Sequence, residues 1–413
     1  MPADVPSRQR TRWRERVLPA SATSDATILL QTRGLRAFGD GLVSTVLAAY
    51  LVGLGYSNHD VGTVATATLV GSAALTLAVG LRGHGLGRRR LLIAVAVLMV
   101  VTGIAFATVT TLWLLVVVGF LGTINPSAGD VSVFLPTEQA LLPATASDDD
   151  RTAMFARYTL VGFTLAAVGA LTANVVHGRA VFLVYAGLGV VAFTRYRRLS
   201  PAVEPAAGAP SVPLGPSRRT VYRLAAVFCL DSFGGGFVIQ VVLALWLFRR
   251  FHLSVGVTGT IFFWSGLLSG FSGLLAVRLA RRIGLIRTMV YTHLPANALL
   301  MATPFMPNAP LAIACLLARS ALSQMDVPAR SSYVMAVVTP AERPAAASVT
   351  NVPRSLASAL TPLAAGWMLD HSTFGWPLVV GGALKAVYDV LLLLLFRHVR
   401  PPEEQRPPVA ATA

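Results

Sequence analysis

The chain has 413 residues, of which 54% are hydrophobic and only 13% are charged. Soluble globular domains carry about 25% charged residues, so this composition excludes an ordinary soluble protein. The formal net charge of +16 would suggest nucleic-acid binding, but no soluble segment of domain size could carry such an interface, and we predict no nucleic-acid partner.

Hydrophobic residues come in runs of roughly 18 to 25, each long enough to cross a hydrocarbon core of about 30 Å as a helix. In chain order they predict twelve membrane-spanning helices, over residues 35–55, 61–80, 91–109, 112–135, 155–175, 180–195, 221–247, 257–277, 287–303, 310–335, 347–369 and 377–396. The Pro- and Ala-rich stretch between the sixth and seventh spans predicts a flexible linker. We therefore expect an all-α membrane protein made of a tail (1–26), a six-helix bundle (27–198), a linker (199–219), a second six-helix bundle (220–398) and a final tail (399–413).

The two predicted bundles share a pattern of polar and helix-breaking residues. Pro136 in the fourth span recurs as Pro328 in the tenth, and Asp40 in the first span recurs as Asp231 in the seventh, at nearly the same separation. This repetition indicates two pseudo-symmetric halves. Parallel repeats related by an axis along the membrane normal place a solute site between the halves.

Arginines are concentrated in the first tail, the loops after the second and eighth spans, the linker and the C-terminal end. All these segments lie on one side of the membrane if the helices alternate in direction. Because cytoplasmic loops carry the excess of Lys and Arg, we expect both termini in the cytoplasm of a multi-pass protein of the plasma (inner) membrane.

Sequence signals for catalysis or for a bound cofactor are absent. Cys229 and Cys315 both fall within hydrophobic spans without metal-type spacing, and there is no His-Glu-x-x-His pair or nucleotide-binding glycine loop. We predict no metal, no cofactor, no catalytic residues and no enzyme activity.

Two six-helix halves, a long central loop and a Gly- and Arg-rich loop between the second and third spans resemble the major facilitator superfamily of secondary transporters. The loop signature of that family runs Gly-x-x-x-Asp-Arg-x-Gly-Arg-Arg/Lys. The chain has His84 and Gly85 in place of the Asp and the first Arg. It matches the signature at its glycines and its final basic pair, Gly80, Gly87, Arg88 and Arg89.

The resemblance implies that the first, fourth, seventh and tenth spans line a central cavity. Asp40 and Asp231 lie in two of them, and a buried carboxylate can take up a proton near neutral pH, so both are candidates for proton coupling or substrate binding. The alternative for Asp40 is an i, i+4 pair with Arg36 on its own helix. Asp231 has no such neighbour along its helix.

The tenth span carries a polar stripe. At 100° per residue, Arg319, Asp326 and Arg330 share one helix face, which cannot face lipid. Asp326 either takes part in proton coupling or neutralises one of the two arginines. In the second case the remaining positive charge would favour an anionic substrate group at Arg319. Arg354 in the eleventh span is a further candidate that could reach a carboxylate of the other half.

Glu138 and Arg330 occupy equivalent places in the two halves with opposite charges. We consider two alternatives for them. Either they, or Glu138 with Arg343, form part of a cytoplasmic gate, or each pairs within its own half, as Glu138 would with Arg151.

Lys385 is the single lysine of the chain and lies one turn before Asp389 in the twelfth span. Because the resemblance implies that this span is peripheral, we interpret the two residues as a structural i, i+4 ion pair. Asn125-Pro126, the glycines at 234–236 and Pro328 should loosen the fourth, seventh and tenth spans.

These features predict a secondary active transporter that moves a small organic solute by alternating access with proton coupling, with export as the preferred direction. Its other expected partner is the lipid bilayer, and we expect a monomer. The alternative is a transporter-like receptor or scaffold without solute flux.

Overall fold

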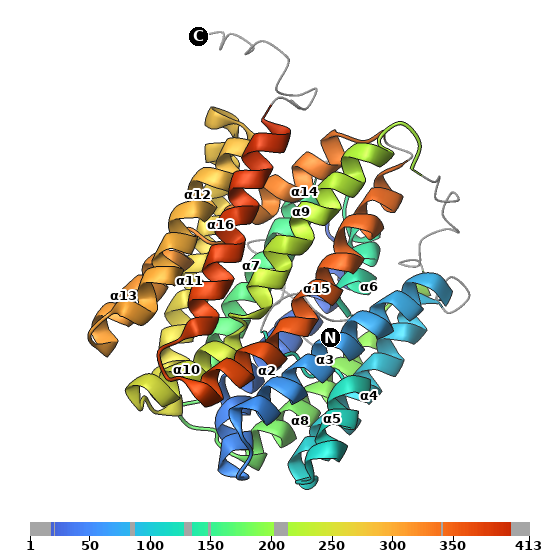
Figure 1. Cartoon of the computed structure of the whole chain (residues 1–413). Helices are drawn as coiled ribbons and strands as arrows, with labels where there is room; N and C mark the ends of the chain where they lie inside the picture. Colours follow the sequence, from blue (N-terminus) through green and yellow to red (C-terminus); the bar gives the residue numbers. More distant parts are fainter. Residues whose placement is uncertain are drawn as a thin grey trace, which may run out of the picture.

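Every regular element in the described part of the chain is a helix (Figure 1). The structure is a computed structural model that describes residues 18–19, 21–82, 87–127, 134–147, 150–201, 214–339 and 342–397. Helices satisfy all their backbone hydrogen bonds within one segment, which is what hydrocarbon surroundings demand.

The first set of helices comprises α2 (Ser24–Gly53), α3 (Asn58–Arg82), α4 (Arg88–Thr108), α5 (Leu112–Leu121), α6 (Phe134–Leu141), the short 3-10 helix η2 (Leu142–Thr145), α7 (Arg151–Thr172) and α8 (Arg179–Tyr196). The second set comprises α9 (Arg218–Gly236), α10 (Gln240–Phe251), α11 (Val255–Ile283), α12 (Leu285–Ala302), the 3-10 helix η4 (Thr303–Phe305), α13 (Ala309–Ser320), α14 (Asp326–Ala336), α15 (Arg343–His371) and α16 (Trp376–Phe396). Within the described residues, eight helical segments are long and apolar enough to cross a membrane, one of them running through α9 and α10. Helices α5 and α13 are shorter apolar helices.

Three predicted spans are interrupted where the sequence loosens them. The fourth is broken after α5, where Asn125 and Pro126 lie in a non-helical stretch. The seventh is broken between α9 and α10, directly after the glycines at 234–236, and the tenth at residues 321–325, just before Pro328. Two of the breaks meet, because the Val241 N–H donates to the Pro126 carbonyl at 3.1 Å. The freed backbone groups thus join the two sets of helices.

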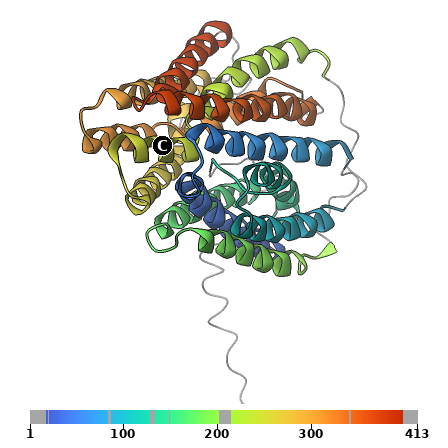
Figure 2. The same cartoon turned by 60° about the horizontal axis from the view of Figure 1, so that its bottom comes forward.

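Helix packing in the second set repeats that in the first. In the first set α2 packs on α7, α3 on α5 and α4 on α8, and in the second α9 packs on α15, α11 on α13 and α12 on α16. Each pair in the second set is the counterpart of a first-set pair six predicted spans earlier. The two sets meet where α3 lies along α15, as both views show, and where α7 packs on α11 (Figures 1 and 2).

The two sets are closed together at one end of the bundle. We call this the distal end, because it lies away from Leu199, Leu214 and Arg397, which mark the terminal end. One apolar core contains distal side chains of both sets, including Leu51 and Trp246. A second apolar core at the terminal end contains residues of the second set only, within the described part of the chain.

Glycines allow the closest approach between the sets. Gly62 of α3 lies against the Pro362 carbonyl of α15, and Gly366 of α15 lies against the Asn58 carbonyl, too close in both places for any side chain. The contact therefore depends on residues without a Cβ.

A carboxylate ties the linker to the start of α15 at the terminal end. Glu342 accepts hydrogen bonds from the Gly215 N–H at 2.5 Å, the Ser217 hydroxyl at 2.9 Å and the Thr339 hydroxyl at 2.8 Å. These bonds, led by that from Gly215, lower the pKa of Glu342 from 4.5 to about 2. A carboxylate whose pKa is lowered by folding stabilises the fold at any pH above its unfolded pKa of 4.5. This stabilisation is lost only as the pH falls towards the lowered pKa, so the Glu342 contacts are constant near neutral pH.

Replacing Gly62 with Ala should force α3 away from α15, because the new Cβ would overlap a backbone carbonyl. Overpacking of this kind destabilises by about 1–3 kcal/mol, so we expect a lower Tm for the purified protein. Gly187→Ala in α8 is the matched control, since its new Cβ meets nothing within 4 Å. Equal Tm values for the two variants would contradict the close approach.

Candidate functional site

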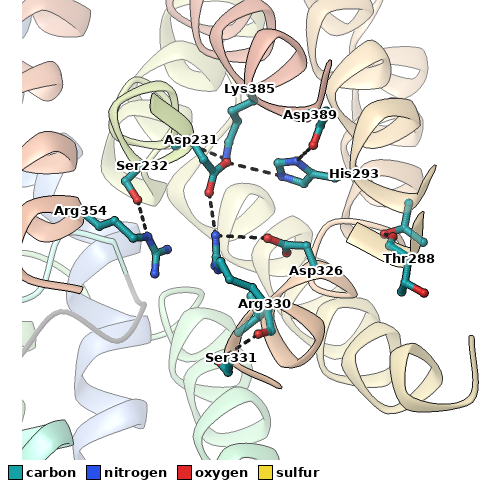
Figure 3. A network of polar contacts seen from close by, with 12 residues as sticks. Asp231, Ser232, Thr288, His293, Asp326, Arg330, Ser331, Arg354, Lys385 and Asp389 are labelled. Carbon is teal, nitrogen blue, oxygen red and sulfur yellow. Dashed lines mark hydrogen bonds and ion pairs between the residues drawn. The ribbon is translucent and has the colours of Figure 1, made fainter. Parts of the chain in front are cut away.

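Asp231 of α9 lies at the centre of a buried charge network in the second set (Figure 3). The Lys385 ammonium from α16 is 2.5 Å from its Oδ1, and a guanidinium nitrogen of Arg330 from α14 is 2.9 Å from its Oδ2. One carboxylate therefore cross-links three helices through two ion pairs. A charge in hydrocarbon costs at least about 2.5–3.5 kcal/mol, which explains why both oxygens carry a cation.

A histidine connects this carboxylate to a second one. His293 of α12 places Nε2 3.8 Å from Oδ1 of Asp231 and Nδ1 2.9 Å from Oδ1 of Asp389 (Figure 3). Asn297, one turn after the histidine, donates to the other oxygen of Asp389 at 2.8 Å. The imidazole thus lies between two buried carboxylates, an arrangement that can hold or pass a proton.

The predicted ion pair between Lys385 and Asp389 is wrong. The two residues are close along α16, but the lysine binds Asp231, and Asp389 takes its hydrogen bonds from His293 and Asn297. The buried Asp231 needs cations from neighbouring helices, whereas donors on α12 satisfy Asp389. Lys385 consequently links α16 to α9 instead of pairing within α16.

Asp326 forms the neutralising contact considered as an alternative. Its Oδ2 is 3.3 Å from a guanidinium nitrogen of Arg330, so Arg330 is shared between Asp326 and Asp231. The stripe predicted along the tenth span is divided by the break at 321–325, which leaves Arg319 on α13. No described side chain forms a hydrogen bond or ion pair with Arg319, and its Nε is buried without a partner.

Arg354 of α15 is held within the second set. Its Nε donates to the Ser232 hydroxyl at 3.0 Å and a terminal nitrogen donates to Asn351 at 3.3 Å. The guanidinium also lies 6.0 Å from the centre of the Phe228 ring. The predicted reach to a carboxylate of the first half is not formed in this state.

Glu138 of α6 has its own network in the first set, and its side chain is 0% exposed. It is paired with Arg36 of α2 and accepts hydrogen bonds from Thr32 at 2.7 Å, from Tyr196 at 2.6 Å and from Tyr158. These donors come from α2, α7 and α8. Glu138 is therefore the cross-link of the first set, as Asp231 is of the second.

The contacts of Glu138 and Arg330 follow the predicted alternative in which each residue pairs within its own half. Both Glu138 and Arg330 are paired within their own set of helices, and neither contacts the other. Among the described side chains, the ion-pair partner of Glu138 is Arg36 of α2. The side chains of Arg151 and Arg343 lie outside the described residues.

Asp40 is buried on α2, and Arg36, its alternative partner, is paired with Glu138. The first and seventh spans thus each hold a buried aspartate. Asp231 is part of the ion-pair network described above, and Asp40 interacts electrostatically with Arg36 on its own helix.

Basic residues at the start of α4 bind the ends of other helices. Arg88 donates to the Ala140 carbonyl at 3.0 Å, near the end of α6, and Arg89 to the Arg197 carbonyl at 2.6 Å, just after α8. Basic side chains bind C-terminal carbonyls favourably. Gly87 precedes the first turn of α4 and Gly80 lies in α3, while His84 and Gly85 lie outside the described residues.

The arrangement can store charge and respond to protonation, but it does not resemble a metal centre. Among the described residues, no group of three or more His, Cys, Asp or Glu side chains could hold a metal ion.

Apolar membrane-length helices around buried, paired charges define a polytopic membrane protein with a polar interior. The family model of the Major Facilitator Superfamily matches residues 32–317 and 224–412, and the chain belongs to this family. It is 23% identical over 426 aligned positions to an uncharacterized membrane protein of Saccharomyces cerevisiae (YJR124C), covering 92% of this chain and 95% of the yeast protein.

Solved transporters share the fold. The nucleoside transporter NupG superposes with a TM-score of 0.72 at 14% identity, covering 91% of this chain and 100% of that one. An inward-facing, unoccupied bacterial homologue of the human lysosomal transporter Spinster gives 0.67 at 14% identity, covering 90% and 96%. The human organic anion transporter MFSD10 gives 0.65 at 16% identity, covering 89% and 98%.

Sequence reasoning missed His293, Asn297 and the partners of Glu138. His293 did carry a signal, because it is a histidine within a hydrophobic span while the others lie at helix ends or in loops. Arg36, Tyr158 and Tyr196 carried none, since their common partner is on a different helix.

Asp231→Asn should lower the stability of the protein, because it leaves Lys385 buried without its counter-ion and Arg330 with Asp326 alone. Breaking a buried pair from one side costs about 3–5 kcal/mol. Adding Lys385→Met to this variant removes one orphaned cation and should restore much of the loss. The measurement is a double-mutant cycle of Tm values on purified protein. Additive losses would show that the two residues do not interact.

Proposed function

We propose that the protein is a secondary active transporter that moves a small organic solute by alternating access. In this proposal twelve helices form two six-helix bundles (27–198 and 220–398) joined by the linker, and the solute passes between them. The recurrence of the same helix packing in both sets supports this arrangement. So do the breaks in three spans expected to line the cavity, because discontinuous helices form the solute and ion sites of many transporters.

Proton coupling through Asp231 is the second part of the proposal. The observation that carries it is a carboxylate bound at once by Lys385 and Arg330 and placed beside His293. A proton delivered through the imidazole would neutralise the carboxylate and release both cations. The three helices α9, α14 and α16 would then lose their electrostatic link and could change their packing.

The closed distal end supports an alternating-access cycle. Asp370 at the end of α15 accepts the backbone N–H groups of Asn58 at 3.1 Å and His59 at 2.8 Å, at the first turn of α3. A carboxylate is favourable at the positive end of a helix. Arg249 of α10 lies 3.7 Å from the same carboxylate. We propose that Asp370, the first turn of α3 and Arg249 together keep the distal end closed, and we call this cluster the distal lock.

Closure of the terminal end would use the charges predicted there. Glu138 and Arg330, together with Arg151 and Arg343, remain our candidates for that gate. In the present state the first two are held within their own bundles. Protonation of Asp231 would leave Arg330 bound to Asp326 alone, and this weaker hold would ease its transfer to the other half.

The placement of arginines supports both termini in the cytoplasm and a plasma-membrane location. We propose export by a monomer, without a cofactor. A receptor or scaffold of the same fold would not give saturable solute flux, and reconstitution separates the two.

The coupling proposal is tested in liposomes that contain a pH-sensitive dye, with a solute first identified by its stabilisation of the purified protein. The wild type should give saturable, solute-dependent proton movement. The double variant Asp231→Asn/Lys385→Met should retain solute exchange but lose proton movement. Asp60→Asn, outside the network, is the control and should behave as the wild type. Normal proton movement in the double variant would refute the assignment, and absence of any saturable flux in the wild type would favour the scaffold.

The distal lock is tested with a cysteine at Thr45, a buried position on α2 next to α10, in a background that lacks Cys229 and Cys315. Asp370→Asn should open the distal end more often and raise the rate of maleimide labelling at position 45 severalfold. Asp60→Asn is the control, because the Asp60 carboxylate accepts its described hydrogen bonds only from the backbone N–H and hydroxyl of Ser57. An unchanged labelling rate in Asp370→Asn would show that the cluster is not a lock.

A further inference from the structure

The membrane interior of the second set contains more positive than negative charge. Its carboxylates are Asp231, Asp326 and Asp389, and its cations are Lys385, Arg330, Arg319 and Arg354. With a neutral histidine, the described side chains therefore leave one cation in excess. An unbalanced charge in low-dielectric surroundings is unfavourable, and a bound anion would remove the imbalance.

Arg319 identifies where the excess charge is located. The three carboxylates already bind other groups, namely Lys385, Arg330 and the His293–Asn297 pair. Arg319 forms no hydrogen bond or ion pair with any described residue, and its buried Nε has no partner. Buried polar groups normally have at least one partner, so this donor is available to a ligand.

Arg354 adds a second set of donors. A guanidinium has five N–H groups, and the described bonds of Arg354 go to two neutral oxygens, those of Ser232 and Asn351. Arg319 and Arg354 both interact electrostatically with Asp231, so this carboxylate is a neighbour that the two arginines have in common. Guanidinium groups match carboxylates and phosphates in geometry. Neither arginine forms an ion pair with a described carboxylate of the protein.

We propose that the transported solute is an organic carboxylate whose anionic group binds Arg319 and Arg354. The excess of a single positive charge favours a monoanion over a phosphate monoester, which carries close to two negative charges at neutral pH. This inference rests on the proposed transport function and names its substrate class. Arg319 is the primary contact and Arg354 the secondary one.

The ligand test compares three compounds on one skeleton, phenylacetate, phenylacetamide and phenethylamine, and the same trio on a cyclohexyl skeleton. Tm is measured for the purified full-length protein as each compound is titrated. The carboxylates should raise the Tm of the wild type more than the amides or amines do. In Arg319→Gln the apparent affinity for the carboxylates should fall by about tenfold or more, because a hydrogen bond to a charged group is lost. Arg223→Gln, an exposed arginine on α9, is the matched control and should keep the wild-type response.

A ligand-free measurement separates binding from structural support. Arg319→Met should raise the Tm of the empty protein, since it removes a half-buried cation that has no partner among the described residues, whereas Arg330→Met should lower it by leaving Asp231 and Asp326 without their shared partner. A lower Tm for Arg319→Met would assign Arg319 to the fold and overturn the proposal.

The remaining outcomes also decide the question. A carboxylate response that is absent, or unchanged in Arg319→Gln, would overturn the anion assignment. If phenethylamine stabilises the wild type and crosses liposome membranes through it, transport stands and the anion assignment fails. If phenylacetate binds at Arg319 but no saturable flux occurs, the site stands and the transport function fails.

Discussion

The structure depends on the requirement that charges within a membrane protein be neutralised inside it. Each set of helices meets most of this requirement with one central carboxylate, Glu138 in the first and Asp231 in the second, and in the second set Arg319 is left without a partner among the described residues. Each of the two binds donors from several helices, and so acts as a polar cross-link where apolar packing alone gives little orientation in lipid. Removing either carboxylate would leave buried cations, which makes both residues structural in addition to the roles proposed for them.

The same requirement applies to the backbone. Three spans are interrupted at proline or glycine, and their freed N–H and C=O groups need partners within the protein. The contact between Val241 and Pro126 shows one solution, in which two breaks from different sets satisfy each other. Asn125 provides a second, because its side-chain oxygen accepts the Ser127 N–H at 3.0 Å within the break. The interrupted segments are therefore stable while remaining able to bend.

Hydrophobic runs predicted an all-helical membrane protein, and eight helical segments within the described residues are long and apolar enough to cross a membrane, because membrane insertion depends on apolar length and composition. The breaks were also readable, since proline and glycine act locally. The pairing of the buried charges could not be predicted from the sequence. Sequence spacing displays only neighbours on one helix, and this favoured Lys385 with Asp389, whereas the lysine binds Asp231 across 154 positions of the chain. Three-dimensional packing determines which helix supplies the partner of a buried charge. This packing cannot be predicted from a single sequence.

Rigid-body rocking alone would not disturb the Asp231 network, because all its members belong to the second set of helices. Under the proposed mechanism a proton must therefore act by changing packing within that set or the charge presented to the solute. Arg330 connects both routes, since it is shared between Asp231 and Asp326 and would shift to Asp326 alone once Asp231 is neutral. Neutralising Asp231 would also increase the positive excess around Arg319. Proton binding would thereby strengthen the attraction for an anion, which gives coupling between the two ligands without direct contact between them.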